Sequence, residues 1–109
     1  MKTKGIRQSI ILQSTPEKVY KKLASKRDTS FSHGKILKLE KDKKIIQKWS
    51  SNLSCWPQGH FSKVVFSIED FNGQTLVRLN QLDVPEACSI PVSEGWHENF
   101  WKPMKTALN

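Results

Sequence analysis

The chain has 109 residues, 37% of them hydrophobic and 26% charged, and 18 Lys and Arg against 10 Asp and Glu leave a net charge of +8. This composition predicts a single globular domain over residues 1–109 and excludes a disordered tail. The longest apolar runs are three residues long, so we expect no membrane span, no signal peptide and a cytoplasmic location.

The positive charge is concentrated in the first half of the chain. Residues 1–54 hold 14 Lys and Arg against 4 Asp and Glu, whereas residues 55–109 hold 4 against 6. Such asymmetry favours an acidic partner, although a lysine-rich surface that is only solvated explains it equally well. No nucleic-acid motif is present and the aromatic residues stand at core-like spacings, so no specific nucleic-acid partner is expected.

The N-terminal part predicts a strand and then a short helix. Alternation over residues 6–13 gives the strand one core-facing side, made of Ile6, Gln8, Ile10 and Leu12. Ser14 or Thr15 can cap the helix that follows, and Pro16 suits its first turn. Its apolar stripe consists of Pro16, Val19, Tyr20 and Leu23. We expect this helix to end near residues 25–26.

Two hairpins are expected in the middle of the chain. After a polar loop over residues 28–33, segments 34–40 and 44–51 predict a hairpin that turns at 41–43. Lys41, Lys43 and Lys44 crowd its tip, where lysines keep a hairpin soluble or else contact an acidic partner. Segments 60–69 and 75–79 predict a second hairpin around Asn72-Gly73, a dipeptide that tolerates positive φ.

An aromatic corner joins the two hairpins. Trp49 and Trp56 flank it, and the run WPQG supplies turn chemistry through Pro57 and Gly59. Large aromatic residues beside such a corner usually anchor it to the core, and we assign Trp49 to the core. Trp56, Pro57 and His60 are kept as candidates for contact with a partner.

The C-terminal part predicts a loop from Val84-Pro85 and then a long helix capped by Ser93. Its stripe of Trp96, Phe100, Met104 and Leu108 is too apolar to be exposed and must pack on the sheet. Pro103 removes the hydrogen bond to the carbonyl of Asn99, so a kink is expected there. The order β, α, ββββ, α predicts an α+β fold in which about five antiparallel strands pack on the C-terminal helix.

Few residues are arranged for catalysis or metal binding. Cys55 and Cys88 lie far apart without CxxC spacing, so we expect free thiols packed as small hydrophobic side chains. Together with His33, His60 and His97 they do not form the spacing of a zinc site. The glycines are isolated and no GxxxxGK loop is present. We therefore expect no enzyme activity, no metal and no cofactor.

The second half of the chain carries a resemblance to a known family. The run IIQKWSSNLSCWPQGHFSKVVFSIEDFNGQTLVRLNQLDVP and the later GWHENFWKPMKTAL resemble the C-terminal domain of activators of the Hsp90 ATPase, a helix-grip, START-like domain. The shared features, in order, are K-W at a strand end, the W-P-x-G-H-F corner, the N-G-x-T hairpin, V-P after the last strand and G-W at the final helix. The run STPEKVYKKL also fits the first helix of the family.

The resemblance implies a co-chaperone of the stress response that binds the N-terminal ATPase domains of Hsp90 and favours their closed, hydrolysis-competent pairing. We expect the chain to be a monomer. The wider superfamily implies an alternative, a binding module for a small hydrophobic ligand. Its cavity would be lined by Trp49, Phe66, Leu79, Trp96 and Phe100, unless these side chains simply fill the interior.

The chain departs from the family in two places. These activators usually carry a separate N-terminal domain that contributes most of the stimulation, and 109 residues leave no room for it. The family also places a strand hairpin between the first helix and the strand expected from Gly34, where only residues 26–33 stand here. Both departures predict weak stimulation of Hsp90 and a smaller cavity.

Overall fold

The computed structural model describes residues 1–24 and 32–108, with side chains for 1–24 and 34–108. The strands are β1 (Thr3–Leu12), β2 (Ser32–Glu40), β3 (Lys44–Ser51), β4 (Ser62–Phe71) and β5 (Gln74–Pro85). A short helix, α1 (Pro16–Ala24), follows β1. The C-terminal helix consists of η1 (Glu86–Cys88), α2 (Ser89–Trp96), η2 (His97–Trp101) and α3 (Lys102–Leu108).

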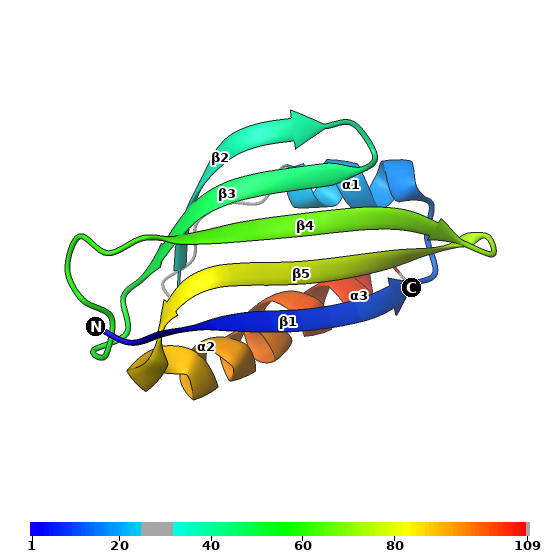
Figure 1. Ribbon diagram of the computed structural model, residues 1–109. Coiled ribbons are helices and arrows are strands. Elements are labelled where there is room, and N and C mark those ends of the chain that lie inside the picture. The colour runs from blue at the N-terminus through cyan, green and yellow to red at the C-terminus, as the bar shows by residue number, and fades with distance from the viewer. Residues whose placement is uncertain (25–31, 109) are drawn as a thin grey trace.

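All strand pairs are antiparallel, and the order across the sheet is β1-β5-β4-β3-β2. The helices lie on one face of this sheet, behind it in the view of Figure 1, and the C-terminal helix runs along β1 and β5. The opposite face, which we call the outer face, carries no helix among the described residues. This arrangement confirms the predicted α+β helix-grip fold.

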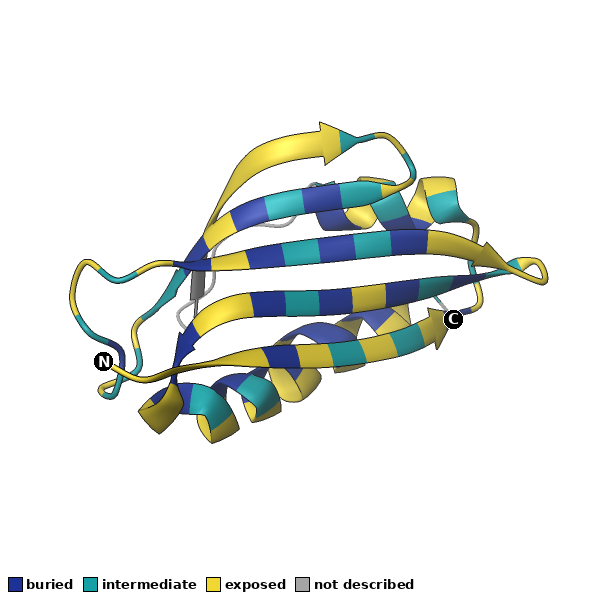
Figure 2. Ribbon diagram, viewed as in Figure 1, coloured by how far each residue is buried: buried dark blue, intermediate teal, exposed yellow. Residues whose placement is uncertain are grey.

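The core lies between the sheet and its helices because side chains alternate along each strand. On β4 and β5 nearly every second residue is buried, which gives the banded colouring of Figure 2. The largest fully buried side chains include Trp49, Trp96, Phe66, Leu12 and Leu23. The C-terminal stripe is buried at Trp96, Phe100 and Met104, as predicted, and Leu108 packs partly against the core.

The cap of α1 is one of the predicted details that the structure decides. The Thr15 hydroxyl accepts a hydrogen bond from the Lys18 amide at 3.3 Å, so Thr15 rather than Ser14 caps the helix. Ser14 instead accepts, through its carbonyl, a 2.6 Å hydrogen bond from the Thr75 hydroxyl. The predicted end of this helix near residues 25–26 lies outside the described residues. Residues 32–33, predicted as loop, belong to β2.

The loop predicted at Val84-Pro85 is wrong, because β5 continues to Pro85. Thr3 pairs with Pro85 and Lys4 with Val84, after a register shift beside Asp83, whose φ is 63°. Proline lacks an amide donor, but at a strand end this loss is tolerated. The Glu86 amide then donates to the Lys2 carbonyl at 2.9 Å, which carries the pairing one residue beyond the strand.

The cap predicted at Ser93 is also wrong, since helical structure begins at Glu86. Pro91 therefore lies in the first turn of α2, where backbone amides have no partner within the helix and proline is tolerated. Ser93 accepts hydrogen bonds from Gln8 instead. Near Pro103, the expected irregularity takes the form of the π-turn η2, in which the Lys102 amide donates to the His97 carbonyl.

Gly73 provides a direct test of the predicted β4–β5 turn. Its φ is 84°, and a Cβ placed there meets no atom within 4 Å, so only backbone strain opposes a side chain. We expect Gly73→Ala to lower the free energy of unfolding by about 1 kcal/mol. Urea denaturation measures the change. Gly73→Asn is the matched control and should lower the free energy of unfolding by less, because asparagine tolerates positive φ. Equal decreases for the two variants would contradict a turn with positive φ at residue 73.

Candidate functional site

The six residues predicted to contact a partner do not form one surface. Lys41, Lys43 and Lys44 lie at the β2–β3 turn, whereas Trp56, Pro57 and His60 lie in the connection from β3 to β4. These two places are at opposite ends of β3, which has 8 residues and therefore a length of about 25 Å. A single small contact cannot include both groups.

The β2–β3 turn presents its lysines to solvent. The Lys43 amide donates to the Glu40 carbonyl at 3.0 Å, and Asp42 adopts a φ of 58°. Lys41 and Lys43 are exposed, while Lys44 is half-buried because it begins β3 and lies opposite Ser67 on the outer face. The turn therefore offers positive charge on a defined backbone.

Hydrogen bonds fold the aromatic corner into two successive turns. The Trp56 amide donates to the Leu53 carbonyl at 2.9 Å, and the His60 amide donates to the Pro57 carbonyl at 3.2 Å. Gly59 has a φ of 78° in the second turn, as turn chemistry predicts. The Trp56 indole N–H also donates to the His60 carbonyl at 2.8 Å.

The corner residues differ in how accessible they are to a partner. Trp56 is only 8% exposed and packs edge-on against Trp49, with ring centroids 5.3 Å apart. The His60 Nε2 atom lies 2.7 Å from the Asp83 carbonyl oxygen, which ties the corner to β5. Trp56 thus anchors the corner, and of the three corner candidates only Pro57 and His60, both half-buried, are accessible to a partner.

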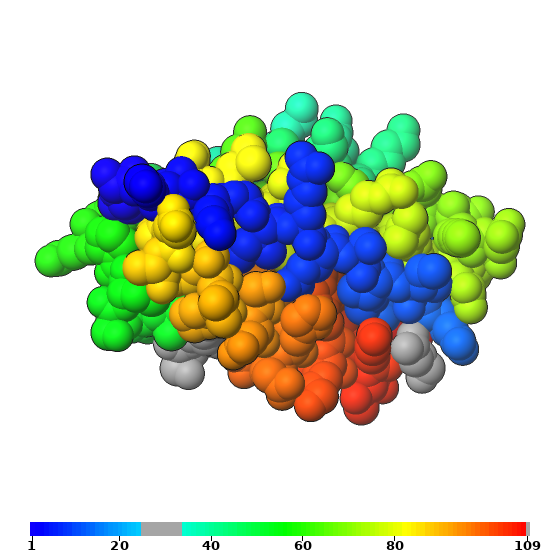
Figure 3. Space-filling model, turned by 60° about the horizontal axis from the view of Figure 1, so that its bottom comes forward, coloured from blue at the N-terminus to red at the C-terminus, as the bar shows by residue number. Residues whose placement is uncertain are grey.

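The prediction of two free thiols is wrong, because Cys55 and Cys88 form a disulfide. Their Cα atoms lie 5.6 Å apart although 33 residues separate them in sequence. The bond attaches the corner to the start of the C-terminal helix, and these segments lie side by side in Figure 3. Sequence spacing does not reveal a pair that only the fold brings together. Disulfides are typical of oxidising compartments, so the cytoplasmic location stays a prediction that this bond does not favour.

The five residues predicted to line a cavity do lie together, but they pack against one another. The ring centroids of Trp49 and Trp96 are 5.5 Å apart, and those of Trp96 and Phe100 are 5.1 Å apart. Phe66 stacks on Phe100 at 5.4 Å, and Leu79 is 1% exposed. These contacts are those of a filled interior. A ligand in this region stays a prediction.

Sequence reasoning did not assign a role to two glutamines that contact the C-terminal helix. Gln81 is fully buried, accepts a 2.8 Å hydrogen bond from the Trp96 indole and donates to the Ser62 hydroxyl at 2.9 Å. Gln8 accepts a 2.6 Å hydrogen bond from the Trp101 indole. Both glutamines occupy core-facing positions of their strands, and this alternation was the signal available. They attach the C-terminal helix to the sheet by polar contacts.

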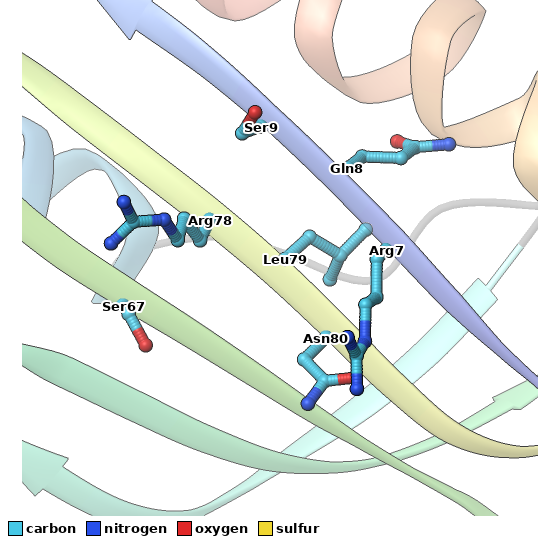
Figure 4. A pocket seen from close by; sticks show the side chains of 7 residues that line it. All are labelled: Arg7, Gln8, Ser9, Ser67, Arg78, Leu79 and Asn80. Carbon is cyan, nitrogen blue, oxygen red and sulfur yellow. The ribbon is translucent and has the colours of Figure 1, made fainter.

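A shallow hollow of about 440 Å³ lies on the outer face over β1, β5 and β4. Arg7 and Asn80 border one side of it and Arg78 and Ser67 the other, as Figure 4 shows. The Arg78 guanidinium pairs with Glu69 at 2.9 Å. The hollow therefore has a mixed polar and apolar lining with two arginines, of which Arg78 is paired, and it lies on the side of the sheet away from the aromatic core.

Two features are absent from residues 1–24 and 32–108. No group of three or more His, Cys, Asp or Glu side chains is placed there to hold a metal ion. Among the same residues, no helix has both the length and the apolar character needed to cross a membrane.

Comparison with known proteins places these features in a family. A family model described as "Activator of Hsp90 ATPase homolog 1-like protein" matches residues 18–109. An uncharacterized protein of Schizosaccharomyces pombe is 34% identical over 75 residues, which cover 69% of this chain and 22% of that protein. The human activator of 90 kDa heat shock protein ATPase homolog 1 is 26% identical over 72 residues, or 66% of this chain and 21% of that protein. The chain thus spans about a fifth of the length of these relatives.

Solved structures share the fold at low sequence identity. A crystal structure of PFC0360w, an HSP90 activator from Plasmodium falciparum, superposes with a TM-score of 0.80 at 14% identity and covers 94% of both chains. The solution structure of the Aha1 dimer from Colwellia psychrerythraea gives a TM-score of 0.75 at 19% identity, with 96% of both chains covered. With the family model matched from α1 to the last residue, this chain belongs to the activator of Hsp90 ATPase homolog 1-like family.

Proposed function

We propose that this chain is an Hsp90 co-chaperone-like protein that binds Hsp90 and stimulates its ATPase weakly. The observation that carries the proposal is family membership over residues 18–109, together with a five-stranded sheet that packs on the C-terminal helix. The human relative is named as an activator of this ATPase, and the chain corresponds to about a fifth of it. A domain of this size offers a small contact area, so we expect a dissociation constant in the micromolar range or weaker.

The stimulation would arise from a shift between conformations of the partner. A bound protein favours the closed, hydrolysis-competent state of Hsp90 only if it binds that state more tightly than the open one. Lys41, Lys43 and Lys44 would act at the rim of the contact, where positive charge speeds association with an acidic surface. Pro57 and His60 are the corner surface that could add a second contact, at the other end of β3.

We expect the chain to bind Hsp90 of its own organism and to raise the ATPase rate to a low plateau. Calorimetry and a coupled ATPase assay measure the two effects. Replacing Lys41, Lys43 and Lys44 with Gln should slow association about two- to fivefold and weaken its dependence on salt.

The matched control removes the same charge from helices on the opposite side of the sheet. It replaces Lys18, Lys21 and Lys105 with Gln, all of which are exposed. This control triple should associate at nearly the wild-type rate. If the wild-type chain does not bind Hsp90, the proposed function is wrong. If both triple variants slow association equally, the role of the turn is wrong.

A further inference from the structure

The outer face of the sheet carries a row of three lysines on neighbouring strands. Lys35 of β2 pairs in register with Lys48 of β3, and Lys48 pairs with Lys63 of β4. All three side chains are exposed. Directly opposed residues on neighbouring strands have Cβ atoms about 5 Å apart, where like charges destabilise a sheet. We call Lys35, Lys48 and Lys63 the lysine row.

The rest of the outer face does not neutralise this row. Further bases on the face, placed by the strand register, are Arg7, Lys38, Lys44 and Arg78. Its acidic residues Glu69 and Glu40 already pair with Arg78 at 2.9 Å and with Lys38 at 3.8 Å. Within the described part of the chain, no ion pair involves the lysine row. The positive charge of the row is therefore not neutralised by a carboxylate among these residues.

Two apolar side chains border the lysine row. Phe61 is 47% exposed and lies beneath the Lys48 ammonium group, 4.0 Å from its ring centroid. Leu82 is 42% exposed and pairs in register with Lys63. Exposed aromatic and aliphatic side chains beside charges are typical of protein–protein contact surfaces, where they supply apolar burial while the charges supply orientation.

The chemistry of the patch favours an acidic protein surface over the other anionic partners. Nucleic-acid bases bind by stacking on aromatic rings, and the Lys48 ammonium group already occupies one face of Phe61. Binding at a lipid surface relies on apolar side chains that insert together, whereas Phe61 lies against Lys48 in the middle of the charged row and Leu82 lies beyond Lys63 at its end. Carboxylates on a protein surface can meet the lysines while apolar neighbours cover Phe61 and Leu82.

We propose that the lysine row, with Phe61 and Leu82, is the docking surface for an acidic segment of a protein partner. The identity of that partner rests on the proposed function, in which it is Hsp90. The row crosses β2, β3 and β4 nearer to the aromatic corner than to the β2–β3 turn, so it is a contact separate from the lysines of the turn.

The test removes the row without shortening its side chains. Lys35, Lys48 and Lys63 are replaced together with Gln, and binding to Hsp90 of the same organism is measured at low and at physiological salt. We expect about a tenfold or larger loss of affinity and a flatter salt dependence, while the control triple at Lys18, Lys21 and Lys105 changes affinity less than about twofold. Equal losses in the two triples would overturn the proposal, because only net charge would then matter.

The melting temperature of the same variant provides an independent test. Because like charges are removed from opposed positions, the melting temperature should rise or stay level. A melting temperature that falls would show that the lysines stabilise the sheet and would count against a surface kept for binding.

Amide chemical shifts of the wild-type protein provide a test that needs no variant. Titrated poly-glutamate should shift β3 and β4 signals around Lys48 and Lys63 and leave α1 unchanged; shifts confined elsewhere would overturn the proposal.

The poly-glutamate titration also separates this inference from the proposed function. Binding of the peptide at the row without any binding of Hsp90 would support the surface and contradict the chaperone as its partner. Single-stranded RNA and phosphatidylserine vesicles are the remaining probes. If the wild-type protein binds either probe more tightly than it binds Hsp90, and the row variant loses that binding, the proposal of an acidic protein partner is wrong.

Discussion

Loss of the Cys55–Cys88 disulfide is expected to lower the free energy of unfolding by about 3.5 kcal/mol. The bond closes a loop with a sequence separation of 33 residues, and the stabilisation follows from the smaller conformational entropy of the cross-linked unfolded chain. For a domain of this size the melting temperature should fall by about 15–25 °C. Thermal unfolding of the Cys55→Ala/Cys88→Ala variant measures the effect, and alanine avoids a hydroxyl at Cys88, which is fully buried.

Reduction of the wild-type protein is the matched comparison for this prediction. Dithiothreitol should shift the melting temperature of the wild-type protein toward that of the double variant and leave the variant itself unchanged. Thiol titration of the native protein should detect no free thiol. Two reactive thiols in the native protein, or a wild-type melting temperature that dithiothreitol leaves unchanged, would contradict a structural disulfide.

The buried contact between Gln81 and Trp96 is expected to give the second large effect. Gln81→Met keeps the side-chain length but leaves the indole N–H of Trp96 and the hydroxyl of Ser62 without this partner. A buried polar group that loses its partner destabilises the fold by about 2–3 kcal/mol. Trp96→Phe should cost a similar amount, because it leaves a small void and removes the donor to Gln81.

A double-mutant cycle separates this contact from simple loss of volume. If the hydrogen bond couples the two residues, the double variant should be less destabilised than the sum of the single variants, by about 1–2 kcal/mol. Urea denaturation of all four proteins provides the free energies. Additive losses would show that the two side chains contribute independently. Glu94→Gln, an exposed change on the same helix, serves as the control and should be neutral.

Local patterns predicted the elements and most of the core correctly. Alternation in β1, β4 and β5, the stripe of α1 and the Asn72-Gly73 turn are features of adjacent residues, so they can be read without the fold. The start of the C-terminal helix could not be read this way. Pro85 and Pro91 suggested a loop, but pairing of β5 with β1 and the tolerance of proline in the first helical turn both override that signal.

The candidate site was less predictable than the fold. The sequence placed lysines at the β2–β3 turn, yet it could not show that Lys35, Lys48 and Lys63 share one row, because that depends on the register of three strands. Nor could it separate the roles within the corner. Trp56 looked like a surface candidate, whereas packing against Trp49 and the hydrogen bond to His60 make it an anchor.

By itself, the sequence determined the order of elements, the apolar faces and the family, because each depends on short-range periodicity and on motifs in fixed order. Only the tertiary structure decided which distant residues meet. Cys55 and Cys88 bond because the corner folds back onto the start of the C-terminal helix, and Gln81 is satisfied because that helix brings Trp96 to it. Contacts between residues far apart in the chain depend on how whole helices and strands pack against one another, and the spacing of residues along the sequence does not predict that packing.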